Sequence, residues 1–319
     1  MVNPGSRVIV QEVGLRDGLQ SVSGIMPTEA KKRWIDAAYA AGVRHMEVAS
    51  FVPARLLPQL ADAAEVIAHA LGYPGLTVTA LVPNLKGAEK ALDSGVHRIV
   101  APISVSTAHS MANVRKSPLD MVEEFRRIRA LCDAGGSAGV PKLIAGLSTV
   151  FGCTLQGEVP LADARDIVLR TLDAGADIVA LADTTGHATP GQVARFLEVL
   201  KPLADDKVTV AHFHDTRGMA LPNTMVALQY GFREFDASLA GLGGCPHAPG
   251  ATGNVATEDL VFMLESMGYW TGIDVKGLLD ARSIIQQALP DAELHGSLAR
   301  AGLPKGYVGR DIQQEGIAA

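Results

Sequence analysis

Two histidines at the end of a short apolar run are the first candidates for chemistry in this sequence. The run Val208–Asp215 reads VTVAHFHD. Side chains alternate along a strand, so His212 and His214 would point to the same side. Two neighbouring imidazoles can bind one metal ion when other donors join them. An H-x-H pair is as often only a hydrogen-bonded structural pair, so the metal-site hypothesis depends on those further donors.

Further donors come from distant parts of the chain. Asp17 follows Arg16 in the segment EVGLRDGLQ, and Asn254 ends a glycine-rich stretch that also carries Cys245. With the two histidines, Asp17 and Asn254 offer two oxygens and two imidazole nitrogens. This mixed set, with room for two more ligands, suits an octahedral divalent ion such as Mg²⁺ or Mn²⁺. Zinc would prefer more nitrogen and sulfur ligands.

These residue types predict chemistry at a chelating substrate. A metal that binds a hydroxyl and a carbonyl oxygen lowers the pKa of the bound alcohol. Arg16 would add a fixed positive charge suited to stabilising an enolate oxygen. The thiol of Cys245, in a loop that could close over the substrate, could donate or accept a proton at carbon. The set fits the cleavage of a carbon–carbon bond, or its formation in the reverse direction.

Each of these residues also has a structural interpretation. Asp17 and Asn254 could only hold turns, and Asp183 in the segment ADTTG could be a helix cap or turn residue. A buried Glu47 without a partner would be costly, so we expect it to pair with Arg16 or with the metal shell. The remaining expectations are a structural role for Cys132 and Cys153, solvent exposure for Arg115 and Lys116, and no assignment for His109 and His187.

The elements that must position these residues alternate regularly. Eight short apolar runs predict buried strands: Arg7–Gly14, His45–Phe51, Leu76–Asn84, Arg98–Ser104, Lys142–Val150, Asp177–Thr184, Val208–Asp215 and Glu234–Gly241. Helical patterns lie between and after them: Thr28–Ala41, Leu57–Leu71, Leu85–Ser94, Leu119–Ala134, Leu161–Ala174, Pro190–Leu203, Met219–Tyr230 and Ala256–Met267. Near-continuous apolar runs are typical of strands covered on both faces.

Eight successive strand–helix units predict an α/β fold, a (β/α)₈ TIM barrel with a C-terminal helical extension. A doubly wound open sheet is the alternative. We expect the catalytic barrel to span residues 1–290 and a tail or capping segment to span 291–319. Active sites of such barrels lie at the carboxyl ends of the strands. Polar residues fall at most of these ends: Arg16, Asp17, Glu47, Asn84, Ser104, Ser106, Asp183, His212, His214, Cys245 and Asn254.

Composition excludes several classes of partner. The 319 residues carry a formal net charge of −6 with no basic stripe, which argues against nucleic acid. No uncharged apolar run is long enough to span a membrane. Three cysteines are too few for a disulfide framework, and no targeting segment is visible, so we expect a cytoplasmic protein.

Several motifs together resemble the 3-hydroxy-3-methylglutaryl-CoA lyase family, in collinear order over about residues 7–290. They are EVGLRDGLQ, SFVPARLLPQL, VPNLKG, LADTTG, HFHDTRGMALPN and GLGGCPHAPGATGN. The R-D-G-x-Q and H-x-H pieces are shared with isopropylmalate and homocitrate synthases, whereas the loop with Cys245 is more specific to the lyases. Leu15 and Thr154 stand where proline is usual. Leu15, His247 and the segment HSMANVRKS could reshape the acyl pocket.

The resemblance implies a reaction and a role for each matching residue. The reaction is cleavage of 3-hydroxy-3-methylglutaryl-CoA, or a close 3-hydroxyacyl-CoA, to acetyl-CoA and acetoacetate, a step of leucine catabolism and ketone-body formation. The implied metal ligands are Asp17, His212, His214 and Asn254. The implied catalytic residues are Arg16, Asp17, Glu47, Asp183, His212 and Cys245, with Asp17 or His212 as base and Cys245 as proton donor. Substrate contacts are expected at Arg16, Asn84, Asp183, Gly243 and Gly244.

Family likeness alone suggests a homodimer, and three alternatives for the function stay open. The first is a lyase for a related thioester such as citramalyl-CoA or isohexenylglutaryl-CoA. The second is a synthase that condenses acetyl-CoA with a 2-oxo acid, which would leave Cys245 without a clear role. The third is a non-catalytic barrel that binds acyl-CoA or metal.

Overall fold

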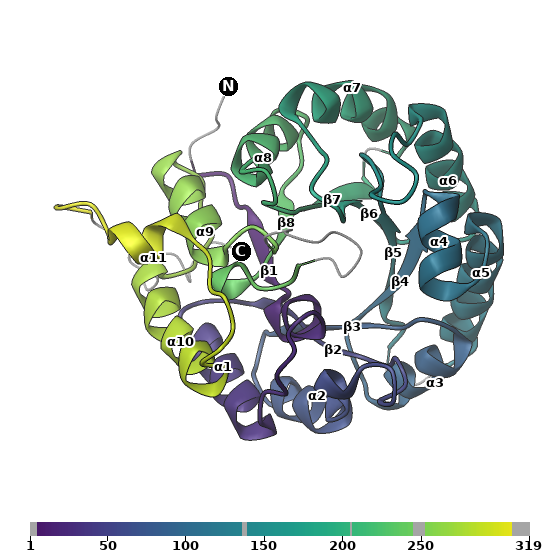
Figure 1. Ribbon diagram of the computed structural model, residues 1–319. Coiled ribbons are helices and arrows are strands. Elements are labelled where there is room, and N and C mark those ends of the chain that lie inside the picture. The colour runs from purple at the N-terminus through teal and green to yellow at the C-terminus, as the bar shows by residue number, and fades with distance from the viewer. Residues whose placement is uncertain (1–4, 136–138, 205, 245–252, 308–319) are drawn as a thin grey trace.

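Eight parallel strands close into a barrel in the order of the chain, β1 to β8 (Figure 1). The structure, a computed structural model, describes residues 5–135, 139–204, 206–244 and 253–307. The strands are β1 Ile9–Glu12, β2 His45–Ser50, β3 Thr77–Leu81, β4 Arg98–Ser104, β5 Lys142–Ser148, β6 Ile178–Asp183, β7 Val208–Phe213 and β8 Glu234–Ala237. The predicted (β/α)₈ architecture is confirmed, and β1 pairs with β8 to close it.

Helices surround the strands as an outer layer (Figure 1). Those of the barrel are α1 Thr28–Ala40, α2 Ala63–Leu71, α3 Leu85–Asp93, α4 Thr107–Val114, α5 Pro118–Ala134, α6 Leu161–Asp173, α7 Pro190–Leu200, α8 Ala220–Gln229 and α9 Thr257–Ser266. Short turns of other helix types are η1 Gly14–Gly18, η2 Pro58–Leu60, η3 Lys201–Leu203 and η4 Leu239–Gly241. The helices α1, α3 and α6 are each followed by a glycine with positive φ, namely Gly42, Gly95 and Gly175, as is common where a helix ends before a strand.

Two local expectations were wrong. The pattern from Leu57 to Leu71 predicts one helix, but Pro58 starts a separate 3₁₀ turn and α2 begins only at Ala63. The segment after β4 forms α4, which no apolar periodicity had indicated. Ser106 caps this helix by accepting a hydrogen bond from the His109 backbone N–H, and Arg115 ends it in the left-handed conformation.

The C-terminal extension is helical, as predicted. α10 (Val275–Ala288) packs against α1, and α11 (Ser297–Ala301) lies beside α9. Among the residues that can be described, no helix is long and apolar enough to cross a membrane. The exact boundary at residue 290 stays a prediction.

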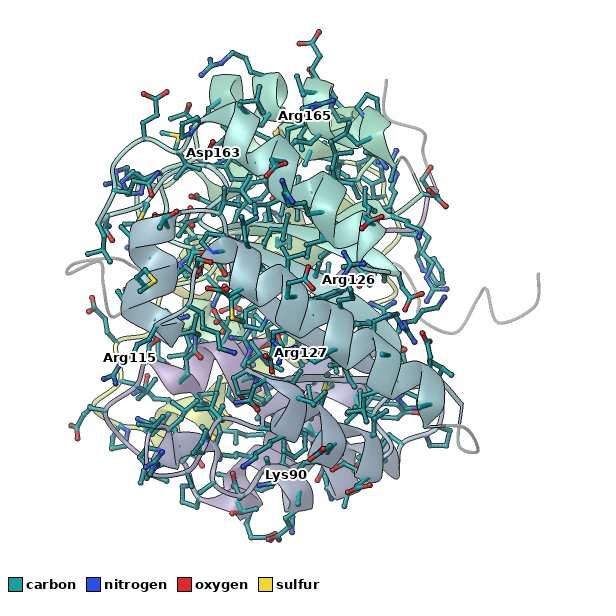
Figure 2. The ribbon with its side chains drawn as sticks, turned by 90° about the vertical axis from the view of Figure 1, so that its right-hand side faces the viewer. Lys90, Arg115, Arg126, Arg127, Asp163 and Arg165 are labelled. Carbon is teal, nitrogen blue, oxygen red and sulfur yellow. The ribbon has the colours of Figure 1, made fainter. Side chains whose placement is uncertain are left out.

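The outer surface carries the solvated charges (Figure 2). Arg126 and Arg127 lie on the outward face of α5, and Arg115 projects from the end of α4. Arg115 is exposed as expected, whereas Lys116 is only partly so and pairs with Glu124 at 3.0 Å.

The inside of the barrel is built from side chains that alternate along each strand. Val100, Ile144, Ala180 and Val210 pack together there, from β4, β5, β6 and β7. Towards the amino ends of the strands, Arg98 of β4 forms an ion pair with Glu234 of β8. Towards the carboxyl ends, the side chains become polar. The interior is therefore apolar where β4 to β7 line it, and most of the polar groups at the carboxyl ends are those that the sequence singles out.

Candidate active site

The turn η1 directly after β1 brings Arg16 and Asp17 into the barrel mouth. Glu12, the last residue of β1, fixes this turn because its carboxylate accepts hydrogen bonds from the backbone N–H of Gly14 (2.7 Å) and of Leu239 (3.0 Å). The Cβ of any other residue at Gly14 would lie 2.5 Å from that carboxylate. Arg16 and Asp17 are both buried, at 8% exposure each.

Asp17, His212 and His214 form a buried cluster whose ligand atoms all lie within 4.8 Å of one another. The Nε2 atoms of His212 and His214 face each other at 3.0 Å. The Oδ2 atom of Asp17 lies 3.9 Å from the first and 3.8 Å from the second. The structure thus joins one residue from the N-terminal turn with two from the end of β7, as the sequence predicts.

Asn254 lies against this cluster. It forms an isolated backbone bridge with His214, and its Nδ2 donates to Asp17 Oδ2 at 2.7 Å. Its Oδ1 is buried and accepts no hydrogen bond from any residue that the structure describes. A buried amide oxygen without a partner, beside one carboxylate and two imidazoles, fits a divalent cation that takes oxygen and nitrogen ligands.

Electrostatics favour the cation-binding forms of Asp17 and His214. Burial opposes ionisation of Asp17, but the charges of Arg16, His212 and His214 outweigh it and hold the pKa of Asp17 well below its ordinary value. Burial and the neighbouring His212 lower the pKa of His214 to about 3, so its imidazole is neutral, as a metal ligand must be. His212 is also buried, but a hydrogen bond from its Nδ1 to Asp236 raises its pKa.

Arg16 is held by two carboxylates. It donates from Nη1 to Asp17 at 2.5 Å and from Nη2 to Glu47 at 2.8 Å. The expected pairing of Glu47 with Arg16 is therefore confirmed. Burial raises the pKa of Glu47, against the effect of Arg16, and Glu47 Oε1 has no hydrogen-bond partner within the described ranges.

Two other predicted site residues make local backbone contacts. Asp183 Oδ1 accepts hydrogen bonds from the backbone N–H of His187 (2.8 Å) and Ala188 (3.1 Å), which holds the loop after β6. Burial raises the pKa of Asp183 to about 6. Asn84 caps α3 by accepting from the Gly87 N–H at 3.1 Å. Their predicted substrate contacts stay predictions.

The glycine-rich segment passes close to the cluster. Gly243 has a φ of +108°, and a Cβ there would lie 2.5 Å from Asn254 Nδ2 and 3.0 Å from the Asp17 carbonyl oxygen. Gly244 accepts a hydrogen bond from the Ser21 hydroxyl through its carbonyl oxygen. Cys245 and His247 lie outside the described residues, so the predicted role of Cys245 stays a prediction.

Sequence reasoning missed the residue that orients His212. Asp236 of β8 accepts from His212 Nδ1 at 3.1 Å and from Gln11 Nε2 at 2.9 Å. Because His212 and Asp236 are register partners, an acidic residue on the strand after the H-x-H pair could have been found from alternation. Cys132 is buried in the core, and Cys153 accepts from the Ser106 hydroxyl at 3.1 Å, so both are structural as expected.

This fold and cluster define a (β/α)₈ barrel enzyme with a candidate divalent-metal site at the carboxyl ends of its strands. The chain belongs to the HMGL-like family, which matches residues 7–285. It is 38% identical over 283 residues to hydroxymethylglutaryl-CoA lyase YngG of Bacillus subtilis, an alignment that covers 89% of this chain and 93% of that protein. It is also 38% identical to the mitochondrial hydroxymethylglutaryl-CoA lyase of Homo sapiens, over 89% of this chain and 86% of that one.

Solved structures agree with this family membership. The HMG-CoA lyase of Bacillus subtilis matches with a TM-score of 0.88 and 36% identity, over 94% of this chain and 99% of that chain. An HMG-CoA lyase from Acinetobacter baumannii, in complex with coenzyme A and 3-methylmalate, matches with a TM-score of 0.89 and 34% identity, over 97% of this chain and 99% of that chain.

Proposed function

We propose that this protein is a divalent-metal-dependent carbon–carbon lyase that cleaves 3-hydroxy-3-methylglutaryl-CoA to acetyl-CoA and acetoacetate. The observation that carries the proposal is the buried cluster of Asp17, His212 and His214 beside the Arg16 guanidinium, in a chain about 38% identical to such lyases. The Acinetobacter relative binds coenzyme A and 3-methylmalate, a hydroxylated dicarboxylate, which supports an acyl-CoA substrate with a polar acyl group.

Asp17, His212, His214 and Asn254 would hold the cation, and Mg²⁺ or Mn²⁺ fits their oxygen and nitrogen atoms. When bound, such an ion supplies Lewis acidity for the hydroxyl and carbonyl oxygens of the substrate. The rest of the chemistry belongs to residues of the chain itself.

Two groups are placed to accept the hydroxyl proton. Asp17 is ionised and has a second carboxylate oxygen that can take the proton. Asp236 binds His212 Nδ1, so His212 could act as the base only if its Nε2 did not hold the cation. As the proton leaves, the C–O bond becomes a carbonyl and the adjacent carbon–carbon bond breaks. The bonding electrons move onto the thioester as an enolate. Arg16, kept charged by Glu47 and Asp17, stabilises the enolate oxygen. Cys245 then supplies the proton that converts the enolate carbon to the methyl group of acetyl-CoA.

The test is product analysis with metal-stripped protein and 3-hydroxy-3-methylglutaryl-CoA, before and after addition of Mg²⁺ or Mn²⁺. Metal-dependent release of acetyl-CoA and acetoacetate, at about 1 s⁻¹ or faster, supports the proposal. Turnover only of citramalyl-CoA or another 3-hydroxyacyl-CoA from a panel would refute this substrate. Cys245→Ala should abolish cleavage with metal affinity retained, whereas an unchanged rate would favour the synthase alternative.

Other expectations extend this proposal. A cytoplasmic homodimer that acts in leucine catabolism and ketone-body formation is the setting the family likeness implies. The molar mass of the native protein in solution, compared with that of one chain, tests the dimer.

A further inference from the structure

A buried serine–histidine pair lies at the end of β4 and has no part in the chemistry described above. Ser104 Oγ and His109 Nδ1 are 2.8 Å apart, and the two residues are 5% and 4% exposed. Ser104 is the last residue of β4, and His109 lies in the first turns of α4. The pair thus lies at the carboxyl end of the barrel, where the substrate must bind.

The strand register places Ser104 in the same row as His212. Ser104 pairs with Ser148, and Ala182 pairs with His212. Leu147 pairs with Leu181, so Ser148 and Ala182 are the next positions along the same two strands. One continuous row therefore crosses β4, β5, β6 and β7, from Ser104 to His212.

All four side chains of this row face the inside of the barrel. Each lies two or four residues beyond an interior residue of its own strand, and alternation keeps such positions on one face. The interior residues are Val100, Ile144, Ala180 and Val210. The two middle members of the row, Ser148 and Ala182, are small and partly exposed. The row is therefore polar at both ends and open between them.

The hydroxyl of Ser104 is oriented by a helix that is itself anchored. The Ser106 hydroxyl caps α4 at the His109 N–H (3.1 Å), and the Ser106 N–H donates to Thr149 Oγ1 (3.2 Å). With its proton on Nδ1, His109 donates to Ser104 Oγ and leaves the serine hydroxyl proton free to donate to another group. A fixed hydroxyl donor of this kind binds an anionic oxygen strongly.

We propose that Ser104, positioned by His109, binds the carboxylate at the far end of the acyl group, across the open row from His212. This inference rests on the proposed function, since it names the part of the acyl-CoA that Ser104 at the end of β4 recognises. An eight-stranded barrel is only wide enough for side chains or one small group. An acyl chain that starts at the metal cluster therefore ends near β4. A terminal carboxylate there would accept the hydroxyl proton of Ser104.

The test is calorimetric binding of two unreactive thioesters to the metal-loaded protein. Glutaryl-CoA carries the terminal carboxylate, and pentanoyl-CoA has a methyl group in its place. Wild type should bind glutaryl-CoA about 10- to 100-fold more tightly, and Ser104→Ala should reduce this ratio to about 3-fold or less. His109→Asn keeps a donor near the Nδ1 position and should preserve most of the ratio, whereas His109→Leu should lose it.

Ser110→Ala is the matched control, because Ser110 is equally buried on α4 but donates to the Lys116 carbonyl oxygen. This variant should bind both thioesters as wild type does. A wild type without preference, or a Ser104→Ala protein that keeps it, overturns the inference. A purely structural pair would lower thermal stability and leave the ratio unchanged.

Turnover separates this inference from the proposed function. With 3-hydroxy-3-methylglutaryl-CoA, Ser104→Ala should raise KM about 10-fold or more and change kcat far less. If wild type shows no cleavage but still binds glutaryl-CoA through Ser104, the proposed function alone fails. If wild type cleaves the substrate and Ser104→Ala does so with unchanged KM, the inference alone fails.

Discussion

Asp236→Asn should weaken cation binding without disturbing the barrel. Asp236 accepts from His212 Nδ1 at 3.1 Å and from Gln11 Nε2 at 2.9 Å, and Gln11 in turn accepts from the Thr79 hydroxyl at 3.1 Å. This chain of hydrogen bonds runs from β3 through β1 and β8 to β7. It fixes the ring of His212 so that Nε2 faces His214 and Asp17.

The expected size of the effect follows from what asparagine changes. Asparagine keeps the shape and one acceptor oxygen, but it loses the negative charge, and a neutral hydrogen bond is about half as strong as a charge-assisted one. Loss of the partner that orients a metal-binding histidine typically weakens metal affinity about 10- to 100-fold. This range corresponds to about 1.4–2.8 kcal/mol. The free energy of unfolding should fall by about 1–2 kcal/mol, because His212 and Gln11 donate to different oxygens of Asp236 and the amide keeps an acceptor for only one of them.

Calorimetric titration of metal-stripped protein with Mn²⁺, together with urea unfolding, measures both quantities. Asp166→Asn is the control, because this aspartate forms an exposed ion pair with Arg170 on α6 at 2.7 Å and contacts nothing in the mouth. It should bind Mn²⁺ as wild type does. The reasoning is refuted if Asp236→Asn binds Mn²⁺ with wild-type affinity, or if the loss of affinity matches a general loss of stability.

Three further changes have distinct expected results. Gly243→Ala places a Cβ 2.5 Å from Asn254 Nδ2, so Mn²⁺ affinity should fall at least about 10-fold by titration. Burial raises the pKa of Glu12 from 4.5 to about 7, so the folded state binds more protons and stability falls as pH rises between these values. In Glu12→Gln, urea unfolding at about pH 5 and pH 8 should show a smaller fall than in wild type, because the contribution of Glu12 is lost while buried Asp183 and Glu47 keep theirs. Arg98→Met leaves Glu234 buried and unpaired, which should cost about 3–5 kcal/mol in unfolding with unchanged Mn²⁺ affinity.

The repeated units of the barrel could be predicted because each strand is covered on both faces and several helices, such as α1, α3 and α6, are followed by a glycine with positive φ. The strand ends were less accurate. β8 ends at Ala237 rather than Gly241, because its last predicted residues form the turn η4. Apolar residues continue beyond Ala237, where the hydrogen bonds between β8 and its neighbouring strands stop. Composition alone therefore does not show where the strand ends.

The cluster of Asp17, His212 and His214 could be predicted from the regular strand pattern, whereas the helix α4 could not. His212, His214 and Asp17 lie at strand ends, where topology alone brings them together. α4 is an eight-residue helix with a mixed surface, and its stability comes from the Ser106 cap and from His109 packing down onto Ser104. Such contacts between neighbouring loops leave no periodic signal in the sequence. The role of His109 therefore became visible only in the structure, whereas Asp236 could have been found from strand alternation.

The cluster can form only when the two ends of the barrel meet. Asp17 follows β1, whereas His214 and Asn254 come from the last third of the chain, and the β1–β8 ladder joins these parts. Glu12, at the end of β1, stabilises the same contact between β1 and the C-terminal part of the barrel, because its carboxylate also accepts a hydrogen bond from the Thr257 hydroxyl at the start of α9 (2.6 Å). A cation bound by all four residues would then stabilise the closed barrel over any form with β1 detached. Metal removal should accordingly increase hydrogen exchange in β1 and β8 more than in β4 and β5, which the cluster does not join.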